Sequence, residues 1–440
     1  MRRKVALFVL SGCSIELLER TSMSIAEMFK EEGASADWAW TVFPSTPYAS
    51  SASLITGLYP QSHGCVVQKY FDSRRSVERL LTCNSLLRNS ILRIVENAGG
   101  KTAIVEGPEG LLKGGTVNVR LFSPELGDFA YYSKVVIRRH DPDVLILKIP
   151  LIRETCYEHG PRSEHVREAL KSVDDFLMEV FELLERKWRN CSKLYILISD
   201  HGVTVAELNE YERIAGLSSK DLNFHVVSQG RLLQIYLKDS RSKLRAVSAL
   251  ANLEGVDLVF EELELKSLKS FSPDIGDLVI SLEEGFYALR DDVIKGCSGG
   301  FTDNEMKVPL MIYGDGVRQG SIIFAELVDV AATIAYYLTI RKAFDGRPIV
   351  EAFDGLSPEA YDKTAELTSL MRYTYRELRK TLKSVMELKR SFAEGALSQP
   401  EYYLKRRDLR LRLRALSYKL KELKSDILLS LSRYKGHTIY

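Results

Sequence analysis

Short apolar runs alternate along the chain with segments of helical periodicity, and this alternation constrains the fold more than any other feature. The apolar runs, which we interpret as β-strands, are residues 5–10, 101–105, 143–148, 194–199, 232–237, 277–281 and 308–313. The segment 163–186 repeats apolar residues every three or four positions, which predicts an amphipathic helix. The pattern is typical of a doubly wound α/β domain with a mostly parallel sheet. In such sheets ligands bind beyond the carboxyl ends of the strands, so the residues directly after each strand are the candidates for chemistry.

The chain has 440 residues, enough for one large domain and a second unit. We expect the α/β domain to span residues 1–355. Within it, the segment 231–281 has the pattern of a strand, a helix, a short strand and a polar turn at 272–276. This predicts a small α+β subdomain inserted before the last core strands.

From residue 356 on, the pattern changes to that of two long helices, each with apolar residues at steps of three and four and with Lys389 as one polar interruption. The apolar positions are Met371, Tyr375, Leu378, Leu382, Val385 and Phe392 in the first helix, and Leu409, Leu413, Leu416, Leu420, Leu423 and Ile427 in the second. Gly395 and Pro400 interrupt the pattern between them. The segment 356–440 therefore predicts an antiparallel helical hairpin, packed as a coiled coil.

The hairpin concentrates positive charge. The net charge of the chain is only +2, yet residues 369–440 hold 18 Lys and Arg against seven Asp and Glu, an excess of +11 that leaves −9 for the rest. Such a surface is a solvated face, a dock for an acidic protein surface, or a contact for nucleic acid or anionic membrane. Aromatic residues do not interleave with the charges as binding of single-stranded nucleic acid would require, and contact with nucleic acid or membrane is possible but not favoured. We expect a protein partner, with a homo-oligomer as the simplest form.

The six cysteines lie far apart and form no CxxC pair, which predicts free thiols in a reducing cytosol. No apolar run approaches the roughly 18 residues of a membrane span. The basic start followed by Leu10-Ser-Gly-Cys13 resembles a lipoprotein signal, with Cys13 as the lipid site. Its apolar stretch of about seven residues is at the lower limit for such a signal. We therefore favour a buried first strand and a cytoplasmic protein.

Three stretches carry residues suited to chemistry. Ser11 follows the first strand, a hydroxyl-rich loop at 43–64 leads into a helix, and Asp200 and His201 follow the strand 194–199. A carboxylate and an imidazole at the end of a buried strand can bind a divalent metal. Alternatively, Asp200 caps the next helix and His201 bonds a backbone carbonyl.

Several segments, taken in order, resemble the alkaline phosphatase superfamily, and most closely its nucleotide pyrophosphatase and phosphodiesterase branch. The matching segments are 52–64 (ASLITGLYPQSHG), 160–163 (GPRS), 198–202 (ISDHG), 274–277 (DIGD), 305–314 (EMKVPLMIYG), 328–335 (VDVAATIA) and 345–348 (DGRP). The resemblance covers roughly residues 1–355. It implies a fold that hydrolyses phosphate or sulfate esters with two divalent metals, usually zinc, held by three aspartates and three histidines. It also implies a Thr, Ser or Cys nucleophile.

This sequence departs from the family pattern at most of those positions. The family's metal-binding Asp and His residues would fall at Ser11, Arg153, Tyr157 and Ser298, and the nucleophile would fall at Pro47, with Thr46 as the nearest hydroxyl. Only Asp200 and His201 retain the ligand type. Two ligands do not hold a catalytic dinuclear centre, since a zinc site takes three or four protein ligands.

We therefore expect a catalytically degenerate, phosphodiesterase-like binding or scaffold protein that binds no metal or a single zinc or manganese ion. Arg153 would place a fixed positive charge in the pocket and is the candidate contact for an anionic small molecule. The alternative is an active, divergent phosphate-ester hydrolase with a rearranged metal site. In that case Thr46 would replace the nucleophile, and Glu154, Glu158 and His159 would replace lost ligands. We expect His63 to be structural, and His159 and His165 to lie on the surface near the start of a helix.

Overall fold

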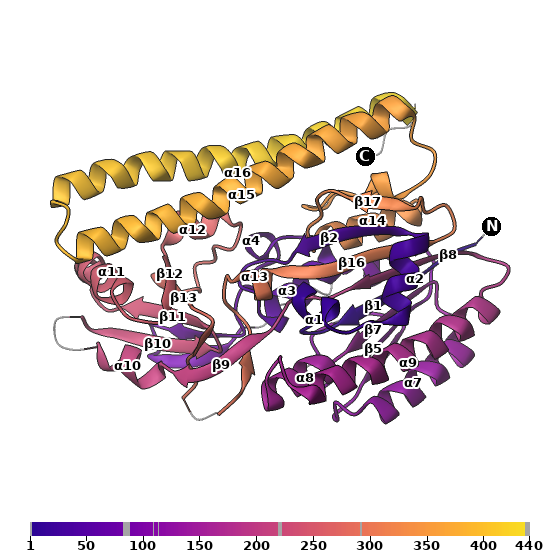
Figure 1. Cartoon of the computed structure of the whole chain (residues 1–440), viewed down its shortest axis with the longest axis horizontal. Helices are drawn as coiled ribbons and strands as arrows, with labels where there is room; N and C mark the ends of the chain where they lie inside the picture. Colours follow the sequence, from indigo (N-terminus) through magenta and orange to yellow (C-terminus); the bar gives the residue numbers. More distant parts are fainter. Residues whose placement is uncertain are drawn as a thin grey trace.

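A computed structural model describes residues 2–81, 89–108, 110–112, 114–218, 222–290 and 293–435. Its centre is an eight-stranded sheet in the order β17-β2-β16-β8-β1-β7-β5-β6 (Figure 1). The strands, in that order, are β17 (Gly320–Ile322), β2 (Ala34–Trp40), β16 (Lys307–Gly314), β8 (Ser192–Ile198), β1 (Arg3–Leu10), β7 (Val144–Ile149), β5 (Thr102–Glu106) and β6 (Val117–Arg120). Of the pairings in this sheet, those of β16 with β2 and β8 are antiparallel, and the others are parallel. The predicted fold class is confirmed.

Helices cover both faces of this sheet because side chains along a strand point alternately to opposite faces. Val5, Leu7 and Val9 of β1 pack under α3, α6 and α14, whereas Ala6, Phe8 and Leu10 pack under helices of the other face. The helices of the first face, with the short α4 beside them, are α3 (Pro47–Thr56), α4 (Pro60–His63), α6 (Ile91–Asn97) and α14 (Asp329–Tyr337). Those of the second face are α1 (Ile15–Glu19), α2 (Ser24–Glu32), α7 (Leu126–His140), α8 (Leu151–His159) and α9 (Glu164–Lys187).

A second, antiparallel sheet has the order β10-β11-β13-β12 and contains the predicted inserted strands. Its strands are β10 (Phe224–Gln229), β11 (Leu232–Leu237), β13 (Leu278–Leu282) and β12 (Val256–Phe260). Because β10 belongs to it, this sheet begins before residue 231. The elements around it are β3 (Lys69–Asp72), β4 (Val77–Leu80), β9 (Thr204–Asn209), β14 (Gly285–Tyr287), β15 (Gly296–Cys297), α10 (Tyr211–Gly216), η1 (Ser240–Ser242), α11 (Lys243–Ala251) and α12 (Glu262–Ser267). Two short helices, α13 (Asp303–Met306) and η2 (Val350–Ala352), lie in the later part of the body.

The predicted helical hairpin is confirmed as α15 (Pro358–Ala393) and α16 (Gln399–Lys435). Figure 1 shows both helices running across the two sheets rather than extending away from them. The apolar seam of α15 shares one hydrophobic cluster with the second sheet and α16; Leu382 and Leu413 are buried in it with Val259. Lys389, the predicted interruption of the seam, donates from Nζ to the carbonyl of Val259 at 2.6 Å and faces Glu261 at 3.6 Å.

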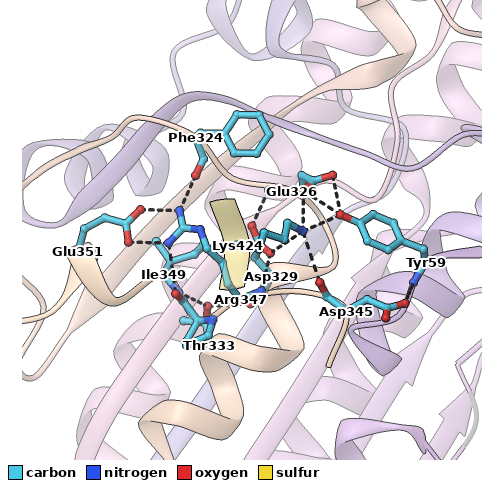
Figure 2. Close-up of polar contacts among 11 residues, drawn as sticks. Tyr59, Phe324, Glu326, Asp329, Thr333, Asp345, Arg347, Ile349, Glu351 and Lys424 are labelled. Carbon is cyan, nitrogen blue, oxygen red and sulfur yellow. Dashed lines mark hydrogen bonds and ion pairs between the residues drawn. The ribbon is translucent and has the colours of Figure 1, made fainter. Parts of the chain in front are cut away.

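A buried polar network anchors the far end of α16 on the body (Figure 2). Lys424 Nζ lies 2.6 Å from a Glu326 carboxylate oxygen, 3.7 Å from Asp329 and 2.6 Å from the hydroxyl of Tyr59. Burial alone would lower the pKa of Lys424, but Glu326 and Asp329 outweigh that effect and raise it. In the same network Arg347, fully buried, forms a bidentate pair with Glu351. The hairpin's charge is thus partly neutralised by the body's own acids.

The structure tests two expectations about the cysteines. Cys65 is disulfide-bonded, so the prediction that all six cysteines are free thiols is wrong; Cys83 lies outside the described residues. Cys13 follows the central strand β1 and is fully buried, and burial raises the pKa of its thiol to about 12. The buried first strand is therefore confirmed.

Within the described part of the chain we find no helix with the length and apolarity needed to cross a membrane.

Candidate functional site

The candidate site lies at the carboxyl ends of three adjacent strands, β8, β1 and β7. Asp200 and His201 follow β8, Ser11 follows β1, and the helix after β7, α8, carries Arg153. Parallel strands bring their carboxyl ends to one edge of the sheet, which is why residues far apart in sequence meet there.

The carboxylate of Asp200 is the centre of the cluster. Its Oδ2 accepts hydrogen bonds from the hydroxyls of Ser11 and Ser51, both at 3.3 Å, and lies 3.3 Å from the ammonium nitrogen of Lys148. The side chains of Asp200 and Lys148 are 0% and 4% exposed, so this ion pair is fully internal. A resident side chain therefore supplies a positive charge beside the retained carboxylate.

Lys148 was not among the residues expected at the site. It lies in β7, whose other side chains are apolar (Val-Leu-Ile-Leu-Lys-Ile), and it is 3% exposed. A lone lysine in a buried strand needs a charged partner, since unpaired burial of an ammonium is costly. That interruption of the apolar run was the available signal.

His201 is fully buried beside Asp200. Its Nδ1 donates to the carbonyl of Gly202 at 3.0 Å, so Nε2 carries the lone pair. Among the described residues Nε2 has no hydrogen-bond partner, and its nearest charge is Asp200 Oδ1 at 3.7 Å. Burial lowers the pKa of His201. The positive charges of Arg153 and Lys148 lower it further, whereas the negative charge of Asp200 raises it. The imidazole is therefore neutral at pH 7.

Gly202 is required after His201 because a Cβ at this position would lie 1.8 Å from the carbonyl oxygen of Asn304.

The other substituted positions also meet. The hydroxyls of Tyr157 and Ser298 are hydrogen-bonded at 2.7 Å, and the Arg153 guanidinium lies 5.9 Å from the ring centre of Tyr157. Arg153 is 3% exposed and forms an ion pair with Glu154. Its backbone packs so closely on Gly12 that a Cβ there would lie 2.8 Å from the Arg153 Cα. Anion binding by Arg153 stays a prediction.

Pro47 and Thr46 form the start of α3. Pro47 occupies the first turn, where its missing N–H costs nothing, and Thr46 is the N-cap, accepting from the amide of Ala49 at 3.3 Å. Thr46 is 4% exposed. Its neighbour Ser45 donates to the carbonyl of Gly300, which ties the start of α3 to the loop that carries Ser298.

The family's dinuclear metal centre does not fit these side chains. In the part of the chain that the structure describes, no group of three His, Cys, Asp or Glu residues is placed to hold a metal ion. Asp200 and His201 are adjacent, but the Asp200 carboxylate already faces Lys148. Most of the cluster is also buried, with Tyr157 partly exposed: the residues at most 4% exposed are Ser11, Thr46, Lys148, Arg153, Asp200, His201 and Ser298.

Three other histidines were considered in the sequence: His63, His159 and His165. His63 is 2% exposed, bonds Ser53 Oγ through Nε2 at 2.9 Å, and accepts the amide of Cys65 at Nδ1. Burial lowers the pKa of His63 to about 3. His159 and His165 stack on each other, with ring centres 4.1 Å apart. The contacts of His63 agree with the structural role expected for it. His165 is exposed in the first turn of α9, as expected, whereas His159 is partly buried and ends α8.

The model of the type I phosphodiesterase / nucleotide pyrophosphatase family matches residues 5–98 and 120–306, more than half of the chain. The chain belongs to this family. The matched region contains the Asp200 cluster and the inserted sheet, and the hairpin lies outside it.

Curated relatives of this phosphodiesterase family include proteins from a nematode and a snake. An ectonucleotide pyrophosphatase/phosphodiesterase of Caenorhabditis elegans is 24% identical over 369 residues, which are 78% of this chain and 48% of the relative. A venom phosphodiesterase of Naja atra is 27% identical over 377 residues, 77% of this chain and 44% of the relative. The chain spans about half the length of these relatives.

Solved structures show the same fold. Human ectonucleotide pyrophosphatase / phosphodiesterase 5 superposes with a TM-score of 0.67 at 17% identity, covering 80% of this chain and 100% of that one. An inactive variant of the murine protein in complex with AMP gives a TM-score of 0.65 at 18% identity, covering 78% of this chain and 97% of that one.

Proposed function

We propose that this protein is a non-hydrolysing member of the phosphodiesterase family that acts as a binding or scaffold protein. The observation that carries the proposal is the internal ion pair between Lys148 and Asp200. Members of the family need cations at this point to neutralise phosphate and activate a nucleophile. Here a lysine ammonium supplies the charge but provides no open coordination position for substrate.

Two further features support the proposal. The hydroxyls of Ser11, Tyr157 and Ser298 bond to Asp200 or to each other, so these three hydroxyls have partners within the cluster. Most side chains of the cluster are also buried, with only Tyr157 partly exposed, whereas the dinuclear centre of a hydrolase must be open to a phosphate ester and water.

The test combines metal analysis with an activity assay on the purified full chain. After incubation with zinc or manganese and dialysis, we expect less than the two metal equivalents of a dinuclear site and no hydrolysis of bis(p-nitrophenyl) phosphate. Binding of two equivalents, together with hydrolysis that Asp200→Ala abolishes, would falsify the proposal.

One observation favours the alternative, a divergent active hydrolase. Thr46 places a hydroxyl at the amino end of α3, one residue before the position expected for the nucleophile. If this alternative holds, Thr46→Ala abolishes hydrolysis, whereas Thr46→Ser retains part of it because the hydroxyl remains. A matched Ser45→Ala variant, in the same loop, controls for loss of loop structure.

For the ligand and the partner we propose an anionic small molecule and a second copy of this chain. The AMP complex of the murine relative makes AMP the first ligand to test for the Arg153 site. Self-association is supported by the opposite charges of the hairpin and the body. A cytoplasmic location stays a prediction: the disulfide at Cys65 is typical of oxidising compartments, although hyperthermophiles have intracellular disulfides.

A further inference from the structure

A cleft lies between the inserted subdomain and the hairpin, and it shares no lining residue with the Asp200 cluster. It is bounded by α11, α12 and the first half of α16, which Figure 1 shows together at one end of the hairpin. Its volume is about 500 Å³, within the range of small-molecule sites. We call it the hairpin cleft.

Positive charge dominates the lining of the hairpin cleft. The basic residues that line it are Arg241, Lys243, Lys266, Arg406, Arg410 and Arg414. Two lining residues, Glu261 and Glu262, are acidic. Glu261 is shared: Arg406 Nη2 lies 2.5 Å from both of its oxygens, and Arg410 Nη2 lies 3.2 Å from one of them. Lys266 pairs with Glu262 and Arg241 with Asp239, and Arg410 also faces Glu264. The six basic groups thus face four carboxylates, so the lining retains a surplus of positive charge.

Several polar groups of the cleft have no partner within the described residues. Tyr402 is 0% exposed, and its hydroxyl makes no hydrogen bond. The Nε atom of Arg406 is likewise buried without a hydrogen bond, and that of Arg410 has only an ion pair with Glu264 at 3.7 Å. Lys243 and Arg414 form no ion pair with any residue that the structure describes. Buried polar groups are normally satisfied, so this set points to a ligand that completes it.

We propose that the hairpin cleft binds a small molecule that carries phosphate groups. Arginine presents a planar fork of donors that matches phosphate oxygens, and several arginines converge here from one helix face. A buried tyrosine hydroxyl adds a directed donor. Tyr403, which is 45% exposed and also lines the cleft, offers an aromatic face to an attached ring. The site is separate from the Asp200 cluster and does not rest on the function proposed for it.

Calorimetric titration of the full chain tests the site with two probes, inorganic tripolyphosphate and ATP, both without divalent metal. We expect both to bind. Lys243→Ala and Arg414→Ala should each weaken binding about tenfold, the effect of losing one charged hydrogen bond. Tyr402→Phe should weaken binding without lowering the melting temperature, because the lost hydroxyl has no partner in the free protein. Tighter binding of ATP than of tripolyphosphate would identify a nucleotide as the ligand; equal binding would identify the phosphate chain alone.

The matched control is Lys421→Ala, which removes the same charge from an exposed position of α16 outside the cleft. It should leave the affinity within about twofold of the unmodified chain, since a distant surface charge acts only through screened electrostatics. Absence of binding overturns the proposal. So does binding that Lys243→Ala and Arg414→Ala leave intact, or that Lys421→Ala weakens equally. Loss of binding in these variants is independent of metal content and hydrolysis, so it separates this proposal from that for the Asp200 cluster.

Discussion

At the scale of single residues, the Lys148–Asp200 pair decides how the candidate site behaves. Its two charges are buried and hydrogen-bonded, so each makes the other tolerable in the interior. Removing one charge leaves the other buried without the opposite charge that offsets its desolvation. The pair therefore links the chemistry of the site to the stability of the fold.

We expect Lys148→Met to lower the free energy of unfolding by about 3 kcal/mol, since breaking a buried pair leaves an uncompensated charge. Asp200→Asn should cost a similar amount. The double variant should lose less free energy of unfolding than the sum of the two single losses, by about 1 kcal/mol or more. The reason is that the second change removes the charge that the first change left unpaired. Urea unfolding of the four proteins measures this coupling. Additive losses would show that the two side chains stabilise the fold independently.

His63 makes the stability depend on pH. Its pKa is lowered from 6.5 to about 3 by burial, so the unfolded chain takes up a proton below pH 6.5 that the folded chain does not. Stability should therefore fall as the pH drops from 6.5 towards 3, by about 1.4 kcal/mol per pH unit from this residue. The lowered pKa of His201 acts in the same direction.

The matched variant is His63→Gln, which has no titrating group. Its stability relative to the unmodified protein should be lowest near neutral pH and should improve on acidification, as measured by urea unfolding at several pH values between 6.5 and 4.5. A constant difference across that range would mean that His63 does not titrate as its burial requires.

At the scale of elements, the apolar pattern of the sequence predicted the buried strands but missed a strand whose conformation depends on pairing with its neighbours. The runs that became β1, β5, β7, β8 and β16 are apolar enough to be recognised from sequence. The strand β2 (Ala-Ser-Ala-Asp-Trp-Ala-Trp) is rich in residues of low strand propensity, and its conformation depends on pairing with β16 and β17.

The site shows the same division. The sequence placed Ser11 and Asp200 directly after two strands, and the structure joins them by a hydrogen bond at the edge of the sheet. The role of Lys148 required its partner in space, which no local pattern of the sequence reveals. Likewise, the sequence showed Lys389 as a polar interruption of the seam and Lys424 as one of the hairpin's basic residues. It did not show that each reaches a buried carboxylate of the body.

Lys424 should be the residue on which docking of α16 depends most. Lys424→Met would leave Glu326 and Asp329 buried close together without their shared cation. We expect a loss of about 3–5 kcal/mol and faster amide hydrogen exchange in the second half of α16. Lys421→Met, on the exposed side of the same helix, is the control and should change stability by about 0.5 kcal/mol or less. Equal exchange in the two variants would show that apolar packing alone holds the helix.

At the scale of the whole molecule, the near-zero net charge is a balance between two surfaces. The hairpin segment 369–440 is strongly basic and the rest is acidic. Ion pairs within the chain neutralise part of this charge: Arg379 pairs with Asp303, and Arg372 pairs with Asp37. Basic groups such as Arg407, Arg414 and Lys421 stay exposed on α16. They lie beside an apolar stripe formed by Leu404, Leu411 and Tyr418, which recur every seven residues and are 55%, 56% and 70% exposed.

This combination predicts a reciprocal dimer in which each hairpin contacts the acidic body of the other copy. Such an arrangement is closed and joins surfaces of opposite charge. Sedimentation of the full chain should show a dimer at low salt that weakens as the ionic strength rises, because exposed charges are screened. Leu411→Ser combined with Tyr418→Ser should yield a monomer, since it removes the apolar centre of the contact. Phe122→Ser, which removes an apolar side chain that is 86% exposed on the body, is the control and should leave the dimer intact. A monomer at all salt concentrations, or a dimer unaffected by the stripe variant, would leave the hairpin's exposed charge as a solvated surface.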